Sequence, residues 1–186
     1  YLDRLPPSLL VSALSTYGGM ASPHGSWPPL AAAALLRGRI KLNAEARSVA
    51  LDLLADYAFD QPDVLAELDK ESSAQQHAVL LPLLRGHRSR IIALMRQELQ
   101  QTIAPESPEE QRDRMARRQA CAAVALLQLG HAEVVWPLLG HRHDPSLRTY
   151  LTHELGRRGV DVELLLDRLT MESDVSARRA LILSLG

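Results

Sequence analysis

The sequence predicts an all-α fold in which antiparallel helix pairs stack side by side as a right-handed α-solenoid. The main observation is a repeat: the residues from Asp144 (DPSLRTYLTHELG) align with those that begin thirty positions later at Asp174 (DVSARRALILSLG). Self-similarity with a period of about 20–50 residues is the sequence signature of stacked repeats. Six aligned pairs are identical: Asp144/Asp174, Ser146/Ser176, Arg148/Arg178, Leu151/Leu181, Leu155/Leu185 and Gly156/Gly186.

Two further observations support the helical fold. Hydrophobic residues make up 46 % of the 186-residue chain, and Leu and Ala, both strong helix formers, dominate among them. No segment alternates with the period of two that is typical of a half-buried strand. The pattern divides the chain into an irregular N-terminal segment over 1–43 with one or two short helices, helical repeats over 44–101, a connector over 102–107, and further repeats over 108–186 that are cut at the C-terminus.

The segments before residue 102 are divided by loop and capping residues. Glycine and proline are dense from Tyr17 to Pro29, which predicts a loop. Ser73 and Gln76 have the spacing of a capping box, in which the two side chains satisfy free N–H groups at a helix start. One helix is predicted to begin at Asn43, and three more are predicted over 63–70, 73–86 and 89–101.

The longest predicted helix begins after the connector. Ser107 is placed to cap it, Pro108 to occupy its first position, and Glu110 to complete a capping box. Gly130 is a suitable residue to follow its last turn. The first half of this helix is charged and is expected to protrude into water. Shorter helices are predicted over 132–139, 146–155 and 160–169, with a last one from Ser176.

Charged residues recur at the helix starts of the repeat. Asp144 and Asp174 can cap their helices, and Arg148 and Arg178 follow four residues later. In a stack, each arginine would reach the capping aspartate of the neighbouring unit, and a ladder of charged hydrogen bonds would result.

Charge and cysteine content limit the classes of function. The formal net charge is −1, whereas a general nucleic-acid binder usually carries a basic excess. Cys121 is the only cysteine, so no internal disulfide can form, and its apolar context predicts a buried thiol. No apolar run approaches the roughly 18–20 residues of a membrane span. We therefore expect a cytoplasmic protein, and the start at Tyr1 and stop within a repeat suggest a fragment of a longer chain.

The Asp-x-x-x-Arg starts, with the leucines after them, resemble HEAT-like repeats. A closer resemblance is carried by ALDLLADYAFDQPDVLAEL, RQACAAVALLQLG, VWPLLGHRHDPSLRTYLTHELGRRGVD and ESDVSARRALILSLG. These strings look like the helical middle region of large bacterial proteins, in which a serine/threonine kinase domain often precedes and a domain similar to formylglycine-generating, sulfatase-modifying enzymes follows. The resemblance covers roughly 44–186. No HRD-type loop or DFG motif is present, so no catalytic residue carries over.

Histidines come closest to a metal site. His141 and His143 flank Arg142 beside Asp144, and no HExxH motif occurs. Zinc needs three or four converging ligands, so we favour loop and surface histidines and predict no metal ligand. The histidines concerned are His131, His141, His143 and His153.

We give the basic segments and the tryptophans structural interpretations. The run RDRMARR over 112–118 favours a solvated helix face over a phosphate contact, because acidic residues precede it. The sequence GRRG over 156–159 is read as a helix stop with exposed arginines. Trp27 and Trp136 are read as packing residues. We predict no catalytic, cofactor-binding or metal residue and no cofactor.

The expected function is a non-catalytic scaffold, spacer or protein–protein interaction module of a larger bacterial signalling or modifying protein. Its expected partner is protein, either another domain of the same chain or a separate one, with no nucleic acid and no membrane. The alternative is a HEAT-like enzyme that resembles bilin lyases or DNA glycosylases. The first would need a nucleophilic or acidic pocket, and the second a basic concave groove with aromatic residues.

Overall fold

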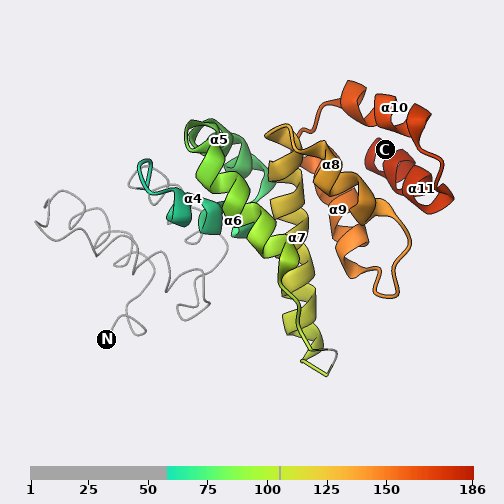
Figure 1. Ribbon diagram of the computed structural model, residues 1–186, viewed down its shortest axis with the longest axis horizontal. Helices are drawn as coiled ribbons and strands as arrows, with labels where there is room; N and C mark the ends of the chain where they lie inside the picture. The colour runs from blue at the N-terminus through green and yellow to red at the C-terminus, as the bar shows by residue number, and fades with distance from the viewer. Residues whose placement is uncertain (1–57, 105) are drawn as a thin grey trace, which may run out of the picture.

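A computed structural model describes residues 58–104 and 106–186 (Figure 1). This part of the chain is helical and contains no strand, so the predicted all-α class is confirmed there. Predictions on residues 1–57, including the loop Tyr17–Pro29, Trp27 and the helix from Asn43, lie outside the described residues. The elements are α4 (Pro62–Glu71), α5 (Ala74–Gly86), α6 (Arg88–Gln100), α7 (Glu109–Gln128), α8 (Ala132–Val135), the 3₁₀ helix η2 (Trp136–Leu139), α9 (Ser146–Arg157), α10 (Val162–Met171) and α11 (Val175–Ser184).

Helix α7 lies in the middle of these elements, between α4 and α6 on one side and α8 and α9 on the other (Figure 1). Its second half is fully buried and rich in alanine. Small side chains let neighbouring helices approach closely, because the interaxial distance follows the residues at the contact. None of the described helices combines the length and the apolar character that a membrane span requires.

The first turns of α7 extend beyond the neighbouring helices (Figure 1). The residues from Glu109 to Arg114 are exposed, whereas those from Gln119 to Leu127 are buried. The prediction that the charged first half protrudes into water is therefore confirmed for these turns.

After α7, the helices α9 and α11 form a series in which each packs on an earlier helix of the chain. Helix α9 packs on α7, and α11 packs on α9, while α10 contacts α11 and η2 contacts both α9 and α11. The leucines of the repeat are core residues: Leu151, Leu155 and Leu181 are fully buried, and Leu185 is partly buried against the core. The repeat in the sequence thus corresponds to two helices that lie against each other.

Several predicted helix ends are confirmed. Ser73 and Gln76 form the capping box at the start of α5, and Gly130, with φ of +83°, follows the end of α7. Asp174 caps α11, since its Oδ1 accepts a hydrogen bond from the N–H of Ala177 at 2.7 Å. The prediction for α9 is not confirmed, because its N-cap is Pro145 and not Asp144, although the Oδ1 of Asp144 accepts a hydrogen bond from the N–H of Ser146 at 2.9 Å.

Two predictions of local structure are wrong. Ser107 does not cap α7: Pro108 takes the N-cap position with an extended ψ of 140°, and no side chain caps this helix. The segment 132–139 is not one helix but α8 followed by η2. The division falls next to Pro137, which lacks the N–H that an α-helix would require there.

Candidate functional site

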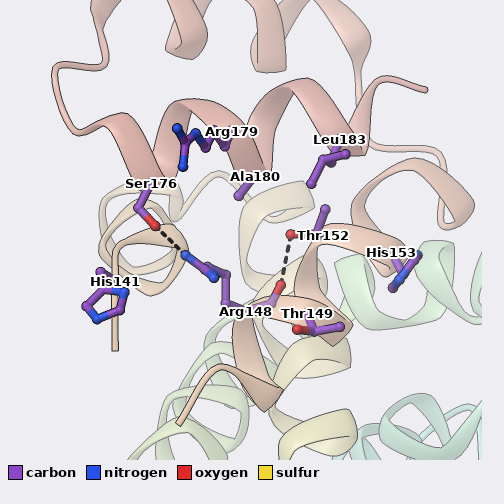
Figure 2. A pocket seen from close by; sticks show the side chains of 9 residues that line it. All are labelled: His141, Arg148, Thr149, Thr152, His153, Ser176, Arg179, Ala180 and Leu183. Carbon is purple, nitrogen blue, oxygen red and sulfur yellow. Dashed lines mark hydrogen bonds between the residues drawn. The ribbon is translucent and has the colours of Figure 1, made fainter. Parts of the chain in front are cut away.

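A surface groove of about 440 Å³ lies between α9 and α11 (Figure 2). Each of the two helices contributes lining residues that are neighbours on one face of that helix. Its lining consists of His141 from the loop before α9, then Arg148, Thr149, Thr152 and His153 from α9, and Ser176, Arg179, Ala180 and Leu183 from α11. The groove therefore arises where the two copies of the sequence repeat meet, while the repeat leucines Leu151, Leu155 and Leu181 face the core.

Charge in the groove is of one sign. The lining contains two arginines, two histidines and three hydroxyl side chains, but no carboxylate and no Phe, Tyr or Trp side chain. Neither Arg148 nor Arg179 forms an ion pair with any acidic residue within 58–104 or 106–186. The groove is therefore suited to an anionic group.

Hydrogen bonds fix the cationic end of the groove. The Nη1 of Arg148 donates to the Oγ of Ser176, which joins α9 to the first turn of α11 (Figure 2). The Oγ1 of Thr152 donates to the carbonyl of Arg148 at 2.8 Å. In Figure 2, His141 and Arg179 lie toward the Ser176 end, whereas Leu183 lies at the opposite end of the groove. The groove thus has a polar, cationic end and an apolar end.

The predicted arginine ladder is wrong in its acceptor. Arg148 does reach the neighbouring repeat, but it binds Ser176 and not the capping Asp174. The Oδ1 of Asp174 accepts instead from the N–H of Ala177 in its own helix. Arg178 is exposed. The signal for the observed contact was present in the sequence, because Ser146 and Ser176 coincide in the repeat, but no role was assigned to them.

The four histidines do not meet. His131 lies 3.1 Å from both Arg96 and Glu133, and His143 is exposed, while His141 and His153 line the groove. Among residues whose placement is described, no three His, Cys, Asp or Glu side chains converge as a metal site would need.

A buried polar network lies deeper, where α4, α5, α7 and α9 meet. Its centre is Arg158, whose side chain is fully buried. The guanidinium donates to the carbonyl of Ser72 at 2.7 Å and to Glu154 at 2.9 Å, and it lies 3.6 Å from the carboxylate of Asp69. The prediction of two exposed arginines in GRRG is therefore wrong for Arg158, though Arg157 is exposed. The predicted helix stop is confirmed, with Gly159 at φ of +66°.

Cys121 is part of this network and is buried, as predicted. Burial raises the pKa of the Cys121 thiol to about 12. His77 belongs to the same network and is fully buried, with Nδ1 at 2.5 Å from Asp69 and Nε2 at 2.5 Å from Gln128. Both ring nitrogens thus face partners other than Cys121, and the Sγ of Cys121 accepts a hydrogen bond from Arg158 at 2.9 Å. A nucleophile–base pair requires direct contact, and His77 and Cys121 do not form such a pair.

The RDRMARR segment divides between two roles. Arg118 binds Glu67, Glu71 and Glu98, each at 2.9 Å, and Arg114 also binds Glu71. Burial opposes the charge of Arg118, but hydrogen bonding to Glu98 and the charge of Glu67 raise its pKa above the ordinary value. The reading as a solvated face is therefore wrong for Arg118, which joins α7 to α4 and α6.

Arg117 extends the same segment toward α9. Its guanidinium lies 5.3 Å from the centre of the Tyr150 ring, within the range of a cation–π interaction. The arginines of this run thus bind carboxylates and an aromatic ring of the protein itself.

Comparison with known proteins returned no match: no family model, no curated protein and no solved structure corresponds to this chain. The resemblance to HEAT-like repeats and to bacterial kinase-linked proteins therefore stays a prediction.

Proposed function

We propose that this chain is a non-catalytic scaffold and protein-interaction module, a right-handed α-solenoid of HEAT-like helix pairs within a larger bacterial signalling or modifying protein. Its partner is protein, either another domain of the same polypeptide or a separate chain in the cytoplasm. Stacked repeats perform this role by holding one face rigid and offering an extended surface on another.

The packing order from α7 to α9 to α11 supports the solenoid. Each helix of this series uses the one before it as its support. The backbones of α9 and α11 also approach each other closely, because a Cβ added at Gly156 of α9 would lie 2.8 Å from the carbonyl oxygen of Ser184 in α11. The glycine that recurs in the repeat is thus required where two units meet.

The observation that carries the interaction role is the exposure of large apolar side chains on the last two helices. Of the eight such side chains in the described ranges, six belong to α10 and α11: Val162, Leu166, Met171, Val175, Ile182 and Leu183. Concentrated apolar exposure marks protein-interaction surfaces, since it is costly in water. We therefore place the partner surface on α10 and α11.

Site-specific photo-crosslinking tests this proposal. A photoreactive phenylalanine analogue replaces Met171 of α10, Ile182 of α11 or, as a control, Val79 of α5; their exposed fractions are 78 %, 56 % and 63 %. In the cells that produce the protein, we expect the first two positions to crosslink to the same protein segment and position 79 not to do so. Absence of a crosslink at both test positions, or the same products at all three, would contradict the proposal.

A further inference from the structure

Arg148 differs from two other arginines that lie between helices. Arg118 and Arg158 are paired with several carboxylates each. Arg148 is also partly buried, yet within the described residues it forms no ion pair, and its side chain bonds to the hydroxyl of Ser176. Charges removed from water are normally paired, so a guanidinium held in this way has hydrogen-bond donors left for an external anion.

The surroundings reinforce this charge. Arg179 of α11 and His141 of the loop before α9 both lie toward the Ser176 end of the groove (Figure 2). Because no carboxylate lines the groove, nothing there neutralises the two guanidinium groups. The chain as a whole has a net charge of −1. The cationic end is therefore a local feature and not part of a general basic surface.

We propose that this groove binds a phosphate monoester on a peptide, as phosphoserine or phosphothreonine, with an apolar residue beside it. The guanidinium fork matches the oxygens of a phosphate in a bidentate manner. The hydroxyl of Ser176 accepts from Arg148 and keeps its own proton as a further donor. Ser176 holds Arg148 in a fixed orientation, which lowers the entropy lost on binding. Ala180 and Leu183 supply the apolar end for the neighbouring side chain. This inference rests on the proposed interaction function and specifies the chemistry of the partner.

A peptide fits the groove better than a nucleic acid. Single-stranded nucleic acids bind through basic grooves in which aromatic side chains stack on the bases. The lining has no Phe, Tyr or Trp side chain, and part of it is aliphatic. The volume of about 440 Å³ suits a phosphorylated side chain and one neighbour.

Fluorescence polarisation tests the proposal with three labelled peptides of the same sequence, Gly-Gly-X-Leu-Gly-Gly, in which X is phosphoserine, serine or glutamate. We expect the phosphoserine peptide to bind at least about tenfold more tightly than the serine peptide, as for charge-assisted hydrogen bonds. The glutamate peptide should be weaker than the phosphoserine peptide. Inorganic phosphate should compete.

Matched variants locate the binding. Arg148→Gln and Arg179→Gln should each weaken the phosphoserine peptide by roughly tenfold. Arg178→Gln removes the same charge from the adjacent, exposed position outside the groove and should change affinity by less than about twofold. Arg179 is exposed, so its variant keeps the test valid if Arg148→Gln does not fold.

Equal binding of the phosphoserine and serine peptides would overturn the inference, as would an equal loss in Arg178→Gln. Tighter binding of a labelled uridine hexanucleotide that depends on Arg148 and Arg179 would also overturn it, in favour of RNA. The crosslinking positions Met171 and Ile182 lie outside the groove lining. Crosslinks there without phosphopeptide binding would therefore reject the anion chemistry and leave the interaction function in place.

Discussion

The guanidinium of Arg158 lies with its Nη2 at 2.9 Å from the Sγ of Cys121, in a region where both residues are buried. Arg158 comes from the end of α9 and Cys121 from the buried half of α7, so the contact joins two successive members of the stack. The same guanidinium reaches Asp69 and Ser72, at the end of α4. One side chain thus connects the α9 end of the repeat region with the helices on the other side of α7.

Arg158→Met should destabilise the protein by about 3–5 kcal/mol, because it leaves the buried carboxylate of Asp69 without its arginine. Urea unfolding followed by circular dichroism measures the change. Arg157→Met is the matched control, since that side chain is 69 % exposed and its pair with Glu154 is long, at 3.7 Å. It should cost less than about 0.5 kcal/mol. Equal losses in the two variants would show that Arg158 has no special role.

The buried thiol should make stability fall at high pH. Burial raises the pKa of Cys121 to about 12, so the unfolded chain, with an ordinary thiol pKa of about 8.5, releases its proton first. The stabilising contribution is therefore complete below about pH 8.5 and is lost as the pH rises toward 12. From about pH 8 to about pH 10, wild type should lose roughly 1–2 kcal/mol more than Cys121→Ala. Parallel pH profiles of the two proteins would contradict this.

The ion pairs of Glu98 should show the opposite pH dependence. Burial alone would raise its pKa, but hydrogen bonds from Arg118 and Lys70 lower it below the ordinary value. Its contribution is therefore present above the unfolded pKa of about 4.3 and is lost as the pH falls through the lower folded value. Glu98→Gln should cost about 3 kcal/mol at neutral pH, and the difference from wild type should shrink in acid.

The control for Glu98 is an exposed pair. Glu133→Gln removes an ion pair with Arg96 whose two side chains are largely solvent-exposed. Such pairs contribute little because both side chains stay in water, so this variant should unfold close to wild type. A cost for Glu98→Gln that is equally small, or that does not change with pH, would disagree with the network described here.

Glycine at position 156 should be required for the contact between α9 and α11. Alanine normally stabilises a helix, but at Gly156 its Cβ would lie 2.8 Å from the backbone oxygen of Ser184. Gly156→Ala should therefore cost about 1–3 kcal/mol through overpacking. At Gly86, in α5, an added Cβ meets nothing within 4 Å, and Gly86→Ala should be neutral or stabilise by up to about 1 kcal/mol. Thermal unfolding of the two variants compares them directly.

The sequence was sufficient where the signal is local. The capping box at Ser73 and Gln76 and the end of α7 at Gly130 depend on residues within a few positions of each other, and both were predicted correctly. The buried repeat leucines follow from helical periodicity in the same way. The error at Ser107 was a shift of one position caused by Pro108, whose fixed φ suits either an N-cap or a first helical residue.

The polar networks could not be predicted, because their partners are distant in the chain. Arg158 binds the carbonyl of Asp69, 89 positions earlier, and Arg118 binds Glu67, 51 positions earlier. In sequence, both arginines belong to basic runs that are typical of exposed surface. The groove is an intermediate case: the repeat indicated that Arg148 reaches the next unit, but it did not reveal Ser176 as the acceptor or the absence of carboxylates around it.

The central claim is that the face formed by α9 and α11 is a recognition surface, and the most direct measurement is an NMR titration of the ¹⁵N-labelled protein with the phosphoserine peptide. We predict chemical-shift changes that concentrate on Arg148, Ser176 and Arg179, including the arginine side-chain N–H signals, while signals from α4 to α6 stay unchanged. An unchanged spectrum, or changes spread evenly over the exposed arginines of all helices, would contradict the claim that the groove between α9 and α11 recognises a phosphorylated peptide.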